Sequence, residues 1–167
     1  MADIATLMLA DHRRIQRLEA SLRKAGQRGG TGPSRTLRST WPHLAAIIQE
    51  HLRSAETICW PAISRTGPRG QAQVRQMKAA ATQIRAAIAT AQAQPLGSPG
   101  WWRAARHVLM SCADHLDEEQ RALLTHFGQY GDLPLRDQLG RQWLTSRNHR
   151  NLAAAGPARP SAPSPSD

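Results

Sequence analysis

The sequence is poor in cysteine, lysine, phenylalanine, tyrosine and long apolar runs. Two cysteines among 167 residues are too few for a disulfide framework, and we expect Cys59 and Cys112 to be free thiols. No apolar run approaches the roughly 18 residues of a membrane-spanning helix, and no charged segment followed by an apolar stretch opens the chain. These absences predict a cytoplasmic protein with no membrane partner.

The formal charge is +10, from 22 basic and 12 acidic residues. Such a balance favours contact with polyanions. The arginines are scattered from Arg13 to Arg159, however, and Trp101 with Trp102 is the only aromatic cluster. Because neither a single basic face nor a base-stacking platform is evident, the sequence favours a solvated basic surface over a nucleic-acid site, although the charge allows one. An unknown protein partner also stays open.

Four stretches carry apolar residues at steps of three and four, which is the period of an amphipathic helix. Glycine- and proline-rich stretches separate them: RGGTGP, TGPRG and QPLGSPG. Asp3 is a suitable N-cap for the first helix, and Ser34 or Thr40 for the second. The predicted helices cover residues 3–25, about 34–63, 71–93 and 101–127, and a shorter helix runs from 132 to about 147.

This pattern predicts an all-α fold, an up-down-up-down four-helix bundle with a short C-terminal helix and a disordered Pro-rich tail. The bundle should occupy residues 1–130. The short helix, residues 131–150, should pack on the bundle, and residues 151–167 form the Pro/Ser/Ala tail.

Polar residues interrupt three of the four apolar stripes. The first stripe is Ile4, Met8, Asp11 or His12, Ile15, Leu18 and Leu22. The second is Leu44, Ile47, His51, Ala55, Ile58 and Ala62, and the fourth is Ala105, Val108, Cys112, His115, Glu119, Leu123 and His126. The third stripe carries no metal donor. A lone histidine of this kind is often a satisfied core residue, and a His–Glu pair is an ordinary helical contact.

Taken together, the polar residues that interrupt the stripes can form one site. At about 100° per residue, His115 and Glu119 differ by roughly 40° around the helix axis and ~6 Å along it, which is close enough to share one ion. In an antiparallel bundle, His12, His51 and His115 also fall at a similar depth. We therefore treat these four residues as one candidate constellation.

Three motifs resemble those of the hemerythrin-like, or HHE cation-binding, domain family. They are LADHRRI around His12, EHLRSAETICWP around His51 and ADHLDEEQRALL around His115, and the ending GPARPSAP is similar to that of many bacterial members. The resemblance implies a non-haem, usually di-iron, centre with histidines as terminal ligands and carboxylates as bridges. When the ligand positions of the family are carried over to this sequence, the resemblance implies that they fall on His12, His51, His115 and Glu119.

The chain departs from the family pattern at two further ligand positions. The second motif normally has a glutamate four residues after its histidine, where this chain has Ala55; Glu56 is rotated by roughly 100° from that position. Ala80 and Ala81 stand where the third helix of the family supplies its ligands. The ligand set for a di-iron centre is therefore incomplete.

Two interpretations follow: a site that weakly binds at most one ion, iron or another divalent cation, or a metal-free bundle. In the first, Cys112 is either an additional thiolate ligand or a small core residue. Without a metal, Glu119 should be hydrogen-bonded to a histidine. The alternatives are an iron/oxygen or nitric-oxide binding or sensing module, and a basic interaction bundle that contacts nucleic acid or another polyanion. No catalytic constellation is visible, so we do not expect an enzyme.

Overall fold

The computed structural model describes residues 2–27, 34–128 and 132–155, and side chains as far as residue 147. Its elements are α1 (Ile4–Gln27), α2 (Arg35–Ser54), a π-helical turn η1 (Ala55–Cys59), α3 (Trp60–Ser64), α4 (Pro68–Gln92), α5 (Pro99–Phe127) and α6 (Leu133–Ala155). The described residues contain no strand, which confirms the predicted all-α class.

Side-chain caps fix where the long helices begin. The carboxylate of Asp3 accepts the N–H of Ala5 at 3.1 Å at the start of α1. The hydroxyl of Ser34 accepts the N–H of Leu37 at 3.1 Å at the start of α2, so Ser34 caps this helix and Thr40 lies buried inside it. Ser98 caps α5 in the same way. Each cap satisfies a backbone donor that has no partner within its helix.

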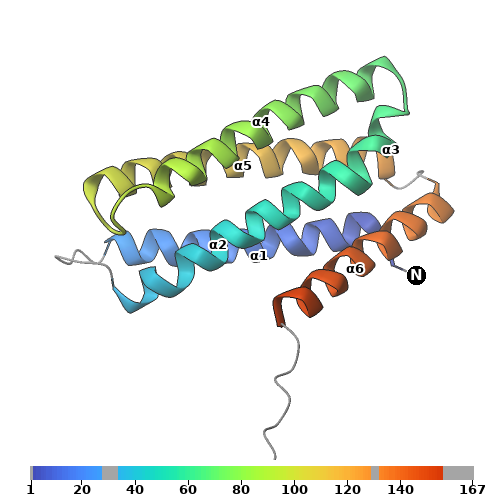
Figure 1. The fold of residues 1–167 in the computed structure, drawn as a ribbon. Helices are drawn as coiled ribbons and strands as arrows, with labels where there is room; N and C mark the ends of the chain where they lie inside the picture. The colour runs from blue at the N-terminus through green and yellow to red at the C-terminus, as the bar shows by residue number, and fades with distance from the viewer. Residues whose placement is uncertain (1, 28–33, 129–131, 156–167) are drawn as a thin grey trace, which may run out of the picture.

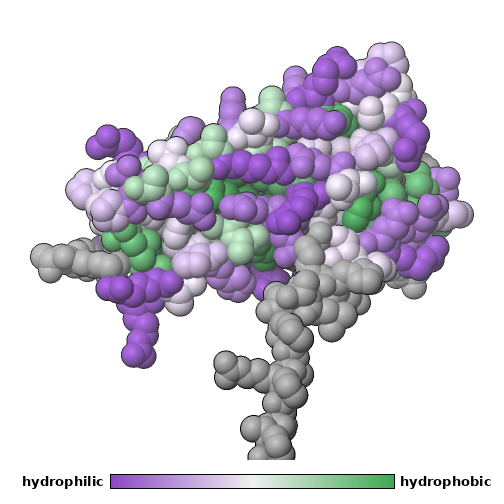
Figure 2. Space-filling view, in the orientation of Figure 1, coloured by the Kyte–Doolittle hydropathy of each residue, from purple (hydrophilic) through white to green (hydrophobic). Residues whose placement is uncertain are grey.

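The long segments lie lengthwise beside one another and alternate in direction (Figure 1). α2, η1 and α3 follow one another without a break and form a single long segment. Apolar side chains fill the space between the segments, while hydrophilic side chains dominate the outer face (Figure 2). The largest fully buried side chains include Trp60, Trp101 and Trp143.

α6 lies across the start of α1 and reaches η1 (Figure 1). Two ion pairs attach it to α1, Arg136 with Asp3 at 2.5 Å and Arg147 with Asp11 at 2.7 Å. A Cβ at Gly140 would stand 1.5 Å from the carbonyl oxygen of Ala2, so the helix approaches too closely for any side chain there.

The C-terminal helix is longer than the sequence predicted. α6 continues to Ala155, whereas we placed its end near residue 147 and began the disordered tail at 151. Leu152 to Ala155 are good helix formers, so α6 continues through them. The remaining predicted tail, residues 156–167, lies outside the described residues.

The two cysteines are free and buried, which confirms that prediction. Burial raises the pKa of both thiols well above 9.0. The Cys59 thiol points to the sulfur of Met8 at 3.1 Å. In the described part of the chain, no helix is both long and apolar enough to cross a membrane.

Candidate metal centre

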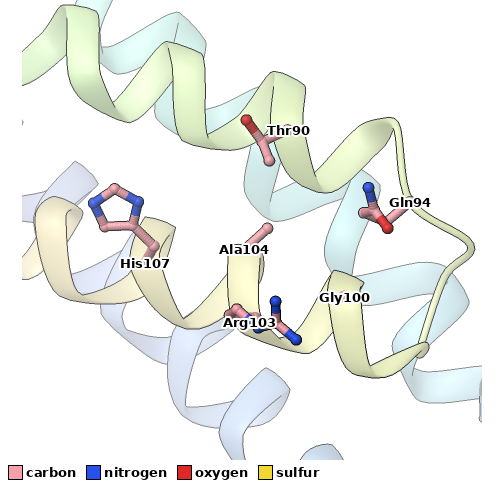
Figure 3. A pocket seen from close by; sticks show the side chains of 6 residues that line it. All are labelled: Thr90, Gln94, Gly100, Arg103, Ala104 and His107. Atoms are coloured by element: carbon pink, nitrogen blue, oxygen red, sulfur yellow. The ribbon is translucent and has the colours of Figure 1, made fainter.

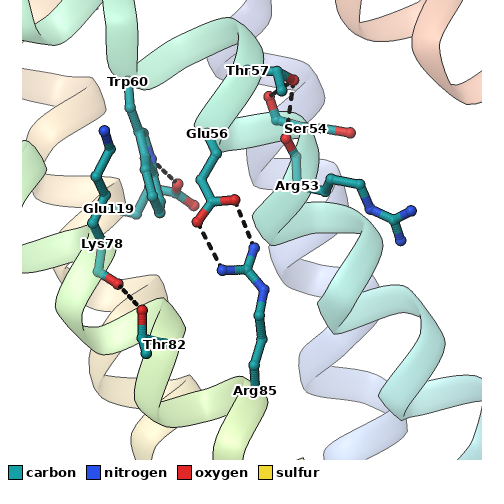
Figure 4. Close-up of polar contacts among 9 residues, drawn as sticks. All are labelled: Arg53, Ser54, Glu56, Thr57, Trp60, Lys78, Thr82, Arg85 and Glu119. Carbon is teal, nitrogen blue, oxygen red and sulfur yellow. Dashed lines mark hydrogen bonds and ion pairs between the residues drawn. The ribbon is translucent and has the colours of Figure 1, made fainter.

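The carboxylate of Glu119 is the centre of a buried polar network. Its Oε2 atom lies 3.0 Å from His12 Nε2 and 2.7 Å from His51 Nε2. Its Oε1 atom accepts the indole N–H of Trp60 at 2.8 Å (Figure 4). Glu119 is fully buried and the two histidines are 2% exposed. The predicted hydrogen bond between Glu119 and a histidine is thus confirmed, and made twice.

Three different helices bring one donor atom each to this point: His12 from α1, His51 from α2 and Glu119 from α5. These three atoms lie within 4.8 Å of one another, and no other such group of His, Cys, Asp or Glu occurs among the described residues. The two imidazole rings meet edge to face with centroids 5.0 Å apart. Two imidazole nitrogens and one carboxylate oxygen suit a single iron or zinc ion in type.

His115, the fourth predicted ligand, lies outside this group. It is 2% exposed, and its ring packs edge to face on Trp60 with centroids 5.9 Å apart. Neither of its ring nitrogens has a hydrogen-bond partner in the described part of the chain. Its side chain instead lines a groove of about 250 Å³ between α4 and α5, beside Met77 and Asp114. The structure therefore brings three of the four predicted residues together.

The charges of the network favour an ion pair in its core. Burial opposes ionisation of Glu119, but the charge of His51 and the hydrogen bonds from both histidines outweigh it and hold the Glu119 pKa well below 4.5. Burial lowers the pKa of His51, but the nearby Glu119 carboxylate more than compensates and raises it above 6.5. For His115 burial prevails, and its pKa falls below 6.5.

Two positions where the family supplies further ligands hold buried alanines here. Ala55 and Ala81 are both fully buried. Glu56, one residue after Ala55, points away from the site and makes a two-point ion pair with Arg85, with N–O distances of 2.8 and 2.7 Å (Figure 4). The described residues therefore do not fit a centre of two ions, whereas the three converging donors fit one.

Cys112 and His126 take no part in the site. Cys112 is outside the donor group, and the carboxyl of Glu19 lies beside its thiol, so the small core residue is the interpretation that the structure supports. His126, predicted on the buried stripe of α5, is half-exposed and contacts Gln73 and Thr66 at 3.1 Å. That placement on the stripe was wrong because α5 turns its Phe127 to the core instead.

Trp60 is the site residue that helical periodicity missed. Nine residues after His51, a regular α-helix would place it about 180° away around the axis. The π-helical turn at Ala55–Cys59 amounts to one extra residue, which reduces that angle to roughly 80°. The indole consequently reaches Glu119. Trp143 of α6 was also not foreseen; it is fully buried, with its ring centroid 5.8 Å from that of His51.

Comparison with known families agrees with this site. The family model of the hemerythrin HHE cation-binding domain matches residues 3–127, and the chain belongs to that family. The matched segment runs from the N-cap of α1 to the last residue of α5, so α6 lies outside it. No match was found among curated proteins or among solved structures.

Proposed function

We propose that the chain is a hemerythrin-type binding module that holds at most one divalent cation, with iron as the first candidate, through His12, His51 and Glu119. The observation that carries the proposal is the convergence of both Nε2 atoms on one oxygen of Glu119, at 3.0 and 2.7 Å. When bound, a cation would supply Lewis acidity, and iron would add one-electron chemistry. The alternating helices support the up-down-up-down four-helix bundle of the family as the scaffold.

The hydrogen bond from Trp60 supports a site for one ion rather than for two. A carboxylate usually bridges two cations through both of its oxygens, and the Trp60 N–H already engages Oε1 of Glu119 at 2.8 Å. Only Oε2 remains directed at the histidines. Ala55 and Ala81 offer no replacement bridge, because methyl groups have no donor atom.

The surroundings of the two histidines support weak binding. A ligating histidine usually donates its second ring N–H to a fixed acceptor, and loss of such a partner typically costs about 10–100-fold in metal affinity. The Nδ1 atoms of His12 and His51 are buried and have no hydrogen-bond partner among the described residues. A cation must also displace the protons that now join both histidines to Glu119, so its affinity should fall in acid.

We infer no catalytic role for this module. Both cysteines are buried thiols with raised pKa values, which makes them poor nucleophiles. Binding of a cation, or of a small ligand to that cation, is the function that the donor set supports.

Metal analysis of protein from iron-supplemented cells tests the proposal, with Glu119→Gln and Glu118→Gln as matched variants. Glu118 is the neighbouring carboxylate and bonds Gln73 and Arg121 outside the donor group. We expect no more than one metal ion per chain, lost in Glu119→Gln and retained in Glu118→Gln. Two irons per chain would contradict the single site, and equal metal content in both variants would exclude Glu119 as a ligand.

A further inference from the structure

Two long segments of the chain contain no acidic residue. No Asp or Glu occurs between residues 20 and 49 or between 57 and 113. The fold brings parts of these two segments to the same end, where α1 and α4 finish and α2 and α5 begin (Figure 1). We call this the basic end, formed by residues 20–27, 35–49, 86–92 and 99–113.

The cations of the basic end are exposed. They are Arg23, Lys24, Arg35, Arg38, Arg103 and Arg106. Several arginines outside the basic end pair with carboxylates, as Arg85 does with Glu56 and Arg147 with Asp11. No salt bridge between described residues involves Arg35, Arg103 or Arg106. Scattered in sequence, the arginines therefore form a concentrated positive surface in space.

A groove between α4 and α5 crosses this surface. It has a volume of about 450 Å³ and is lined by Thr90, Gln94, Gly100, Arg103, Ala104 and His107. Figure 3 shows Thr90 on α4 and Gln94 in the turn after it along one side, and Arg103 and His107 on α5 along the other. Hydroxyl, amide, imidazole and guanidinium groups all donate to phosphate oxygens. A Cβ at Gly100 would lie 2.6 Å from Gln94 Oε1, so glycine leaves room for that amide.

We propose that the basic end binds the phosphate backbone of duplex DNA without sequence preference, and that the Arg103–His107 groove receives one phosphate. Duplex DNA carries one charge per about 1.7 Å of axis, and release of its counterions drives the binding of a cationic surface. The proposal does not depend on the metal site.

The tryptophans of the basic end favour a duplex over a single strand. Single-strand binders stack bases on exposed aromatic faces. Trp41 and Trp101 are only 5% and 1% exposed, with ring centroids 5.1 Å apart. Trp102 is half-buried and lies against Gly26, where a Cβ would stand 2.7 Å from its ring. Trp41 and Trp101 offer bases no free ring face, and Gly26 covers part of Trp102, which favours contact with phosphates.

Fluorescence anisotropy with a labelled random-sequence duplex, titrated between about 50 and 200 mM salt, tests the proposal. The variant is Arg103→Gln with Arg106→Gln. The control, Arg65→Gln with Arg69→Gln, removes the same charge from the turn after α3 and the first turn of α4, at the opposite end of the bundle. Circular dichroism verifies that both variants are folded. Each lost phosphate contact lowers the slope of log affinity against log salt by about 0.9, so we expect a fall of about 1.8 in the first variant only.

Several results would overturn the proposal. An equal loss of duplex affinity in both variants would mean that only net charge matters, not the position of the arginines. No binding to the duplex even at low salt would contradict the proposal outright. Tighter binding to a single strand of the same sequence would exclude the duplex as the preferred ligand. Binding to phosphatidylserine vesicles without binding to DNA would assign the surface to a membrane instead.

Discussion

The indole N–H of Trp60 and the Oε1 atom of Glu119 form a 2.8 Å hydrogen bond inside the core, where neither side chain is exposed to solvent. The bond holds in place the one carboxylate that both histidines share. It also engages the oxygen through which a second cation would usually bind. Trp60 thus stabilises the Glu119 carboxylate with a neutral hydrogen-bond donor, where a second metal ion would otherwise stabilise it.

Replacing Trp60 by phenylalanine should destabilise the fold beyond the loss of ring volume. An unsatisfied buried acceptor costs about 1–3 kcal/mol. Trp143→Phe is the matched control, because Trp143 is also fully buried but its N–H has no partner among the described residues. Urea denaturation of the metal-free variants should show Trp60→Phe less stable than Trp143→Phe by about that amount. Equal losses would mean that the hydrogen bond contributes no net stability.

The ion pair of His51 and Glu119 should give metal-free protein a characteristic pH dependence. The pKa of His51 is raised above 6.5, so its contribution is complete below 6.5 and is lost as pH rises through the folded-state value. The pKa of Glu119 is lowered below 4.5, so its contribution is present above 4.5 and lost as pH falls through the folded-state value.

The stability difference between wild type and Glu119→Gln should therefore shrink as pH rises beyond 6.5. Comparing the variants removes most of the opposing effect of His115, whose lowered pKa favours unfolding in acid. Chemical denaturation in the presence of a chelator measures this difference, and Glu118→Gln should show no such trend. A constant difference on the alkaline side would argue against an ionised His51.

Restoring the missing donors should raise the metal content. Ala55→Glu with Ala81→His places a carboxylate and an imidazole at two fully buried positions. Overpacking typically costs about 1–3 kcal/mol, which bound metal can offset. We expect more iron per chain than in the parent, and a further increase when Trp60→Phe releases Oε1 of Glu119. Matched buried substitutions away from the site, Ala62→Glu with Ala87→His, should give no increase. A folded double variant with unchanged iron would show that the residues are not the remnant of a larger centre.

Gly140→Ala should detach α6 from the start of α1. The added Cβ would collide with the carbonyl oxygen of Ala2 at 1.5 Å, and a backbone atom cannot give way as a flexible side chain would. Hydrogen exchange should increase along α6, and Trp143 should become quenchable in fluorescence. Thr145→Ala, on the exposed face of the same helix, should leave both unchanged. Unaltered exchange in Gly140→Ala would show that the close approach at Gly140 is not needed to hold α6 on α1.

Periodicity and capping rules predicted where the helices lie, although α6 continues to Ala155, beyond its predicted end near residue 147. Glycine and proline end helical segments locally, and the predicted caps Asp3 and Ser34 supply oxygens to the first backbone N–H groups. The same local rules also place His12 and His51 on buried faces. These predictions hold because they depend on residues only a few positions apart.

Features that depend on irregular or distant contacts were not predicted. The π-helical turn has no reliable sequence signal, and it rotates Trp60 into the site. Glu19 is buried where Leu18 was expected, and burial raises the pKa of its carboxyl. The gathering of arginines at the basic end required the topology, since Arg35 and Arg103 are far apart in sequence. The apolar stripe of the fourth predicted helix likewise does not show whether the His115 side chain reaches Glu119 or lines the neighbouring groove.

The boundary of α6 has a consequence for how such a domain could be inherited. All three donors belong to the segment that identifies the family, which finishes at residue 127, yet Trp143 covers His51 from outside it. The segment that the family model matches and the segment that encloses His51 are therefore different. A gene fusion made at the family boundary would carry the complete donor set but leave one side of His51 open to water, and its histidine would then titrate more as it does in a peptide.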